Sequence, residues 1–362
     1  MGFGLSRWQR IFLSLGCGSF LLLACTRNPT EPTLALPVEV SYQGQGEVSY
    51  WLGGKRAAVS VAFDDARASH WQLAAPTLEE YGFRGTFNLN TGCIRNWEAW
   101  IRLFEHGHEI GSHTRSHPDL AKISLDEAEE EMRRSLQDLA SGIPGLARVV
   151  SFCYPYGSST PELRAIGSRY FVCQRAINGR SATAINCRPV TRSTLSCARG
   201  YGVYPPYDSI SFGPILDETI RCGGWIIIYW HSLSMDGPFT STVAPYGLFR
   251  DLMDELEQRS DSIWVATQAE IARYVLEREQ TRVTVRIQPD GRALAVSLSD
   301  VYTGLPIIPL TVCLRLPRKW QSTGTKLRLR ARFPRTCRRK RKNMAEIQIA
   351  PGETVEVQAF HE

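Results

Sequence analysis

The chain has 362 residues, of which 43% are hydrophobic and 22% are charged. This is ordinary globular composition, with enough length for a large domain and a small one. The formal net charge is +6, but much of the excess lies in a basic run without acids between Leu327 and Lys342. The rest of the chain is close to neutral and contains no DNA-binding motif, so nucleic acid is not an expected partner.

Residues 1–25 have the pattern of a bacterial targeting segment. Two arginines precede an apolar stretch at residues 11–24, which is too short for a comfortable membrane span. The stretch ends in Leu-Leu-Ala-Cys, which resembles a lipobox with Cys25 as the acyl acceptor; an ordinary signal peptide is the alternative. Residues 26–50, rich in Pro and Thr at first, are expected to be a tether and lead-in. These features predict a lipid-anchored protein of the bacterial cell envelope, at the periplasmic face or the outer membrane.

Between residues 51 and 280, strand-like and helix-like patterns alternate. Strands are expected at residues 59–63, 85–92, 108–114, 149–157, 224–233 and 263–267, and helices at residues 71–83, 97–108, 124–140, 246–260 and 267–279. Repeated strand–helix units predict an α/β fold with a mostly parallel sheet or barrel. In such folds the functional site lies at the carboxyl ends of the strands.

Residues 281–362 change to an alternating strand pattern and predict a small all-β domain without catalytic residues. A Pro-Asp-Gly turn separates its first two strands. The basic run is expected to be a solvated loop, with contact to anionic lipid or polysaccharide as the alternative. Eight cysteines follow Cys25, and an exported chain permits disulfides among them. We expect Cys313 to pair with Cys337, because both lie in this last segment.

Polar residues stand at several of the predicted strand ends. Asp64 and Asp65 directly follow the first strand, and burying such carboxylates unpaired costs several kcal/mol, roughly. Either this is a solvated strand end or a positive group is held there. His113 and His117, four residues apart, can reach one metal ion, although two unrelated surface histidines are the alternative. A His, His, carboxylate set leaves open metal positions, as catalytic sites do, while the other carboxylate accepts a proton from water.

Four motifs in order, Phe-Asp-Asp-Ala, His-Thr-Arg-Ser-His, Tyr-Pro-Tyr-Gly and Tyr-Trp-His-Ser, resemble the polysaccharide deacetylases, the NodB-homology carbohydrate esterases of family 4. The resemblance covers about residues 55–279. It implies a distorted (β/α) barrel of about seven strands and a divalent metal, with zinc expected and cobalt, nickel, iron or manganese as alternatives. It also implies hydrolysis of acetyl groups on an acetylated polysaccharide, first the N-acetyl groups of an amino-sugar polymer. An O-acetyl esterase and a catalytically weak carbohydrate-binding lipoprotein are the alternatives.

The resemblance assigns roles to six residues. Asp64 matches the catalytic base, and Asp65 matches a metal ligand. His113 and His117 match the two histidine ligands. Tyr156 matches the residue whose backbone N–H stabilises the oxyanion, and His231 matches the general acid.

Three features depart from the family pattern. Ala66 replaces a Gly after the aspartate pair, and the acidic partner of the general acid is not identified. The family arginine that braces the catalytic base before the Pro-Tyr turn is missing, and Cys153 and Tyr154 stand there instead. Arg175 is the candidate substitute from a neighbouring strand end, and we group it with the substrate-binding residues; a surface arginine is the alternative.

Overall fold

The computed structural model describes residues 46–360, except 177–178, 302–303, 322–324, 332–335 and 342. The targeting segment, Cys25 and most of the expected tether therefore lie outside the described residues. In the part of the chain that is described, no helix combines the length and apolar character needed to cross a membrane.

The main sheet is parallel and follows the order β6-β5-β4-β3-β2-β8-β7, with β11 pairing beside β2. Arg175 at the end of β6 bridges to Ala198, shortly before β7, so the seven-strand path nearly closes on itself. This confirms the predicted α/β fold with a distorted barrel of about seven strands. The strands are β2 (Ala57–Asp64), β3 (Thr86–Leu89), β4 (Glu109–Ser112), β5 (Ser151–Cys153), β6 (Cys173–Arg175), β7 (Gly200–Gly202), β8 (Trp225–Trp230) and β11 (Ile263–Val265).

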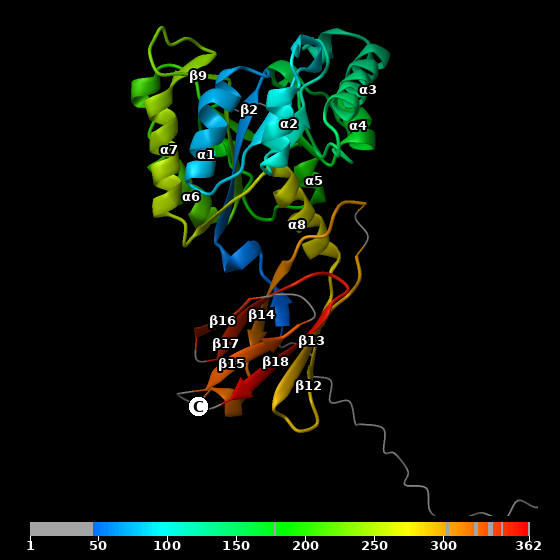
Figure 1. The fold of residues 1–362 in the computed structure, drawn as a ribbon, viewed down its shortest axis with the longest axis vertical. Coiled ribbons are helices and arrows are strands. Elements are labelled where there is room, and N and C mark those ends of the chain that lie inside the picture. Colours follow the sequence, from blue (N-terminus) through cyan, green and yellow to red (C-terminus); the bar gives the residue numbers. More distant parts are fainter. Residues whose placement is uncertain are drawn as a thin grey trace, which may run out of the picture. The chain divides into compact units, whose positions relative to one another are not determined.

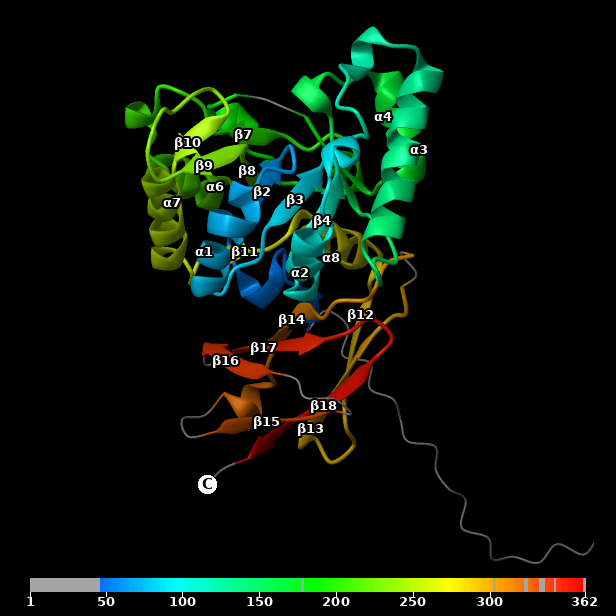
Figure 2. The same ribbon diagram turned by 45° about the horizontal axis from the view of Figure 1, so that its top comes forward.

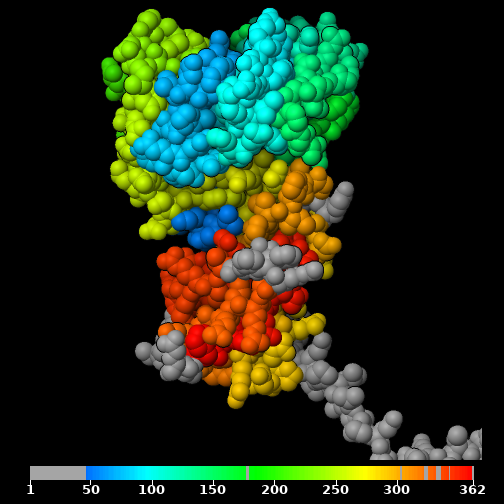
Figure 3. Space-filling view, in the orientation of Figure 1, coloured from blue at the N-terminus to red at the C-terminus, as the bar shows by residue number. Residues whose placement is uncertain are grey.

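Helices lie outside these strands (Figure 1). They are α1 (Ala75–Glu80), α2 (Glu98–Glu105), α3 (Leu125–Gly142), α4 (Pro161–Tyr170), α5 (Arg192–Leu195), α6 (Gly213–Cys222), α7 (Tyr246–Gln258) and α8 (Gln268–Gln280). In the space-filling view, the residues around α1 and α2 lie side by side on one face (Figure 3). Because helices cover it, β2 is buried along its whole length, as expected for a parallel strand.

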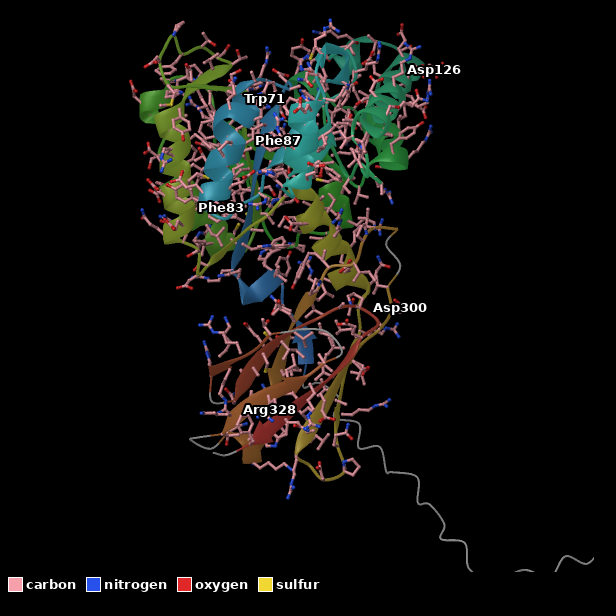
Figure 4. The ribbon with its side chains drawn as sticks, viewed as in Figure 1. Trp71, Phe83, Phe87, Asp126, Asp300 and Arg328 are labelled. Atoms are coloured by element: carbon pink, nitrogen blue, oxygen red, sulfur yellow. The ribbon has the colours of Figure 1, made fainter. Side chains whose placement is uncertain are left out.

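Aromatic side chains fill the space between the helices and the sheet. Phe63 of β2 stacks on Phe87 of β3 with ring centroids 5.2 Å apart, and Trp71 meets Trp100 of α2 edge to face. Asp126, at the beginning of α3, instead points away from the strands (Figure 4). The amphipathic pattern of α3 is reinforced by a complete capping box between Ser124 and Glu127.

The helix expected at residues 71–83 differs in detail. The chain forms one π-helical segment, His70–Ala74, before α1 begins at Ala75. Pro76 stands in the first turn of α1 and has no N–H to donate. A regular α-helix cannot run through this position unchanged, and the wider π-turn absorbs the difference.

The C-terminal region contains two four-stranded antiparallel sheets, β12-β13-β18-β15 and β1-β14-β17-β16 (Figure 2). Strand β1 comes from the expected lead-in and pairs with β14. Two further short strands, β9 (Ser232–Ser234) and β10 (Val243–Pro245), pair with each other after β8. The C-terminal strands are β1 (Gly46–Val48), β12 (Val283–Ile287), β13 (Ala293–Leu298), β14 (Leu310–Arg315), β15 (Lys326–Arg330), β16 (Cys337–Arg341), β17 (Met344–Ile349) and β18 (Thr354–Phe360).

The basic run is not simply a loop, because β15 and β16 occupy most of its described residues. In β15, Leu327 and Leu329 pack against the apolar core while Lys326, Arg328 and Arg330 are exposed. Both strands end their sheets. Exposed Lys and Arg on such edges discourage pairing with another chain.

The expected Cys313–Cys337 disulfide is wrong. Cys313 lies opposite Glu346 and Cys337 lies opposite Ile347, on the two strands that flank β17. Two strand spacings separate their backbones by about 9–10 Å, beyond the reach of a disulfide. Their shared location at the end of the chain did not reveal that another strand lies between them.

Candidate metal centre and active site

The carboxyl ends of four parallel strands gather the predicted site residues at one edge of the barrel. Asp64 ends β2, His113 follows β4, Tyr156 follows β5 and His231 follows β8. These residues line one pocket of about 440 Å³. The six residues assigned to the base, the acid, the oxyanion donor and the metal all belong to its lining: Asp64, Asp65, His113, His117, Tyr156 and His231.

Unusual backbone conformations are concentrated at this pocket. Among the described residues, five that are not glycine have positive φ, namely Asp65, Ala66, Thr114, His117 and Tyr156. All five are pocket residues or immediate neighbours of pocket residues. Left-handed conformations are unfavourable for L-residues by roughly 1–2 kcal/mol each, and such strain is typical of functional sites. Ala66 has φ 51°, which explains why a glycine would also suit this position.

Asp65, His113 and His117 form a compact triangle of ligand atoms. Asp65 Oδ1 lies 3.5 Å from His113 Nε2 and 3.3 Å from His117 Nε2, and the two Nε2 atoms are 3.1 Å apart. Three vertices of a tetrahedron with metal–ligand bonds of about 2.0–2.1 Å are separated by about 3.3–3.4 Å. The triangle therefore has the size of three zinc ligands that leave a fourth position open.

The neighbouring contacts orient this triangle. His113 Nδ1–H donates to the carbonyl oxygen of Cys153 at 2.8 Å, which leaves Nε2 as the ring atom that faces the triangle. Arg67 donates to Oδ2 of Asp65, while Oδ1 is buried without a hydrogen-bond partner. Burial opposes ionisation of Asp65, but the two histidines outweigh it and lower its pKa. An orphaned, ionised oxygen beside two imidazole nitrogens fits a divalent cation.

Asp64 is held by different partners. It is 3% exposed, and Nη2 of Arg175 lies 2.7 Å from Oδ1 and 2.5 Å from Oδ2. Asn88, its partner in the β2–β3 register, donates to Oδ1 at 2.9 Å. Burial acts to raise the pKa of Asp64, but Arg175, His113 and His231 together outweigh it and the pKa is lowered. Asp64 is therefore an ionised carboxylate held in a fixed orientation.

Arg175 is fully buried, so it is neither a surface arginine nor a residue that contacts substrate in the pocket. Its guanidinium lies 3.9 Å from the ring centroid of Tyr229 and 2.7 Å from the sulfur of Cys153. Cys153 and Arg175 are direct partners in the β5–β6 register. Arg175 thus reaches Asp64 from β6, beside the small side chain of Cys153 on β5.

His231 faces the pocket beside two tyrosines. Its ring centroid lies 5.8 Å from that of Tyr204 and 6.2 Å from that of Tyr229. Burial lowers the pKa of His231, against the opposing influence of the two aspartates. Its backbone is anchored by His70, whose Nε2–H donates to the His231 carbonyl at 2.8 Å. Burial lowers the pKa of His70 to about 4, so His70 is neutral.

Sequence reasoning missed His70, Asn88 and the packing role of Cys153. Asn88 stands at the end of a predicted strand that neighbours β2, so its position carried a usable signal. His70 did not, because its contact depends on how the π-helical segment meets the end of β8. Tyr156 was found by its motif, and it is 63% exposed with its ring against His117.

The chain is similar to several known proteins. Residues 53–171 match the family model for polysaccharide deacetylase. The chain is 27% identical over 303 residues to a gellan lyase from Bacillus sp., and 26% identical over 141 residues to the peptidoglycan-N-acetylmuramic acid deacetylase PdaC from Bacillus subtilis. These matches cover 78% and 38% of the chain, but the chain spans only 12% and 28% of the two relatives.

A solved structure of a putative polysaccharide deacetylase from Mycobacterium smegmatis is also similar. Its TM-score is 0.47 at 17% identity, over 63% of this chain and 93% of that one. The matched residues 53–171 include the three residues whose ligand atoms form the triangle, Asp65, His113 and His117. The similarity to the polysaccharide deacetylase family is therefore to this part of the chain, which contains β2 to β5 and five of the six predicted site residues.

Proposed function

We propose that this protein is an exported, lipid-anchored, metal-dependent hydrolase that removes N-acetyl groups from an amino-sugar polymer. The observation that carries the proposal is the pairing, in one pocket, of a zinc-sized ligand triangle with a separate, arginine-held carboxylate. A site that only binds sugars has no need of this division between two adjacent acids. The match of residues 53–171 to the polysaccharide deacetylase family model supports the same reaction class.

Asp65, His113 and His117 are the residues that would hold the cation, which when bound polarises an acetyl carbonyl and acidifies a water molecule. Asp64 then has a defined task. Its ionised carboxylate accepts the proton of the attacking water, and its fixed orientation avoids reorganisation during the step. Arg175 keeps Asp64 ionised at the pH of the reaction.

Tyr156 and His231 complete the reaction on the chain's side. Tyr156 lies in a left-handed turn that lines the pocket, and its backbone N–H is the proposed donor to the oxyanion of the tetrahedral intermediate. Protonated His231 donates to the nitrogen of the departing amine, and the bond between that nitrogen and the acetyl carbon breaks. Because burial lowers the pKa of His231, its protonated form is a stronger acid than a free imidazolium.

Acetate release tests this function. Purified protein supplied with zinc or cobalt is incubated with N-acetylglucosamine oligomers and, separately, with an O-acetylated xylan. We expect acetate from the N-acetylated oligomers and none from the Asp64→Asn variant carrying the same amount of metal. Acetate from the xylan alone would make the protein an O-acetyl esterase. No acetate from either glycan, with metal bound, would leave a carbohydrate-binding protein and overturn the proposal.

The lipid anchor is tested separately. Cys25→Ser removes the proposed acyl acceptor, so the variant should leave the membrane fraction and appear with soluble envelope proteins. Metabolic labelling with a fatty acid should mark the parent and not the variant. Equal membrane association of both proteins would contradict the anchor without affecting the hydrolase proposal.

A further inference from the structure

Two cysteines that sequence reasoning did not connect lie against each other at the opposite end of β8 from His231. The sulfur atoms of Cys187 and Cys222 are 2.7 Å apart. Unlinked thiols do not approach so closely without repulsion, whereas a disulfide bond of about 2.05 Å requires little further movement. Among the described cysteines, no other pair of sulfur atoms is recorded in contact.

The backbone around the two residues is fixed independently of the sulfurs. Asn186, which precedes Cys187, exchanges two backbone hydrogen bonds with Trp225 at 2.8 and 2.9 Å. Cys222 ends α6, and Gly223 turns the chain back with φ 65° to reach Trp225. The Asn186 side chain also accepts from the N–H of Arg199 and donates to the carbonyls of Arg199 and Trp225. Cys187 is thereby held beside Cys222 before any covalent link exists.

The pair is accessible to an oxidant. Cys187 is exposed and Cys222 is partly exposed, whereas Cys153 and Cys173 are buried. The geometry points to a disulfide between Cys187 and Cys222. Each thiol gives up one proton and one electron as the sulfur–sulfur bond forms. A disulfide-bearing oxidant, such as an oxidoreductase of an exporting compartment, accepts the two electrons and two protons. Its own disulfide bond breaks, and it becomes a dithiol.

The disulfide would stabilise the place where the barrel closes. Cys187 lies in the segment between β6 and β7, and Ala198 of the same segment exchanges backbone hydrogen bonds with Gln174 and Ala176 to close the barrel. Cys222 is 35 residues further along the chain. Closing a loop of this length restricts the unfolded chain substantially. The bond lies near the start of β8, about 20 Å along the strand from His231, so it acts on stability and not on the chemistry.

Peptide mapping tests the inference on the full chain. The folded protein is treated with oxidised glutathione, the remaining thiols are alkylated, and the digest is analysed without reductant. We expect one linked peptide pair that joins Cys187 to Cys222. Two alkylated thiols at these positions, or a link from Cys187 to another cysteine, would overturn the proposal.

Thermal melting provides the second readout. The oxidised protein should melt about 10 °C above the reduced protein. A Cys187→Ser/Cys222→Ser double variant should melt like the reduced parent and ignore reductant. Cys197→Ser, an exposed cysteine in the same segment, is the matched control and should retain the full response to reductant. A response that survives in the double variant would contradict the inference, and mapping of the parent decides the matter if the double variant does not fold.

Both readouts are independent of the hydrolase proposal, because neither requires turnover. If the protein releases acetate, the rate at moderate temperature should be the same before and after reduction. A protein that fails to release acetate can still carry the disulfide, so the two proposals fail separately.

Discussion

At the scale of single residues, the two neighbouring aspartates have different partners: Asp65 faces two histidines, and Asp64 faces Arg175. We therefore expect Asp64→Asn to retain the metal and lose activity by about 10²–10⁴-fold, because only the proton acceptor is lost. Asp65→Asn should lose bound metal as well as activity. Metal analysis of both purified variants, with acetate release measured on the same samples, tests this. Equal metal loss in both variants would reverse the assignment.

We infer that Arg175 positions Asp64, because it contacts Asp64 and does not line the pocket. Arg175→Ala should lower kcat and leave KM nearly unchanged. Removing the guanidinium also raises the pKa of Asp64, so the loss of activity on the acidic side should move to higher pH. Arg175→Lys should recover part of the rate. The pH–rate profile is the measurement. The neutral control is Arg169→Ala, which removes an exposed arginine of α4 that pairs with Glu129 of α3. An unchanged acidic limb in Arg175→Ala would exclude this role.

The aspartates, histidines and Tyr156 could be found from the sequence because motif spacing and strand ends are local features. Arg175 could only be proposed. Its distance from Asp64 depends on the pairing of Cys153 with Arg175 across β5 and β6, and β6 is only three residues long. A strand that short carries no readable alternation.

At the scale of elements, α8 carries a buried carboxyl group that should make stability depend on pH. Glu277 accepts the backbone N–H of Ile308 at 3.2 Å, and burial raises its pKa to about 7. The folded protein therefore holds this proton where the unfolded chain has released it. The stabilisation is complete below the ordinary pKa of 4.5 and is lost as the pH rises through about 7, a change of about 2–3 kcal/mol.

Glu277→Gln should remove this dependence, because its side chain does not titrate. Denaturant unfolding of parent and variant between about pH 4.5 and pH 8 measures the difference. We expect the parent to lose more stability than the variant toward high pH. Parallel curves for the two proteins would show that Glu277 is ionised in the folded state.

The longer elements were predictable and the short ones were not. Helices such as α3 and α7, and the apolar strands β2 and β8, have strong periodicity or long apolar runs, and the structure contains them near the expected bounds. The sequence pattern predicts no strand or helix between β6 and α6, although this stretch closes the barrel. Its strands are three residues long and its pairing is formed by tertiary contacts.

At the scale of the whole molecule, the last helix of the barrel and the C-terminal sheets share a core. Tyr274 of α8 is fully buried in the apolar cluster of those sheets and donates to the carbonyl oxygen of Ser49 at 2.9 Å. Strand β1, which precedes the barrel in the sequence, joins one of these sheets by pairing with β14. The small domain is therefore built from both ends of the described chain.

Removing residues 281–362 should expose Tyr274 and leave β1 unpaired. Burying an aromatic side chain contributes about 1.5–3 kcal/mol, and Trp264, which packs against the same cluster, is affected as well. We expect the shortened protein to melt at least about 10 °C lower than the full chain, or to be insoluble. Arg328→Ser, an exposed change in β15, is the control and should melt like the parent. A shortened protein with the parent's melting temperature would establish an independently folding barrel.

Because left-handed backbone conformations cluster at the pocket, its lining residues differ in how freely they can be substituted. Asp65, His117 and Tyr156 have positive φ, a backbone conformation that few side chains tolerate. Three other lining residues, Tyr204, Ser241 and Thr242, lie in connecting segments, after β7 and between β9 and β10. A redesign of this protein for a different glycan should therefore vary the residues of these connecting segments and keep the three left-handed residues. Most substitutions at the left-handed positions would produce unfolded variants.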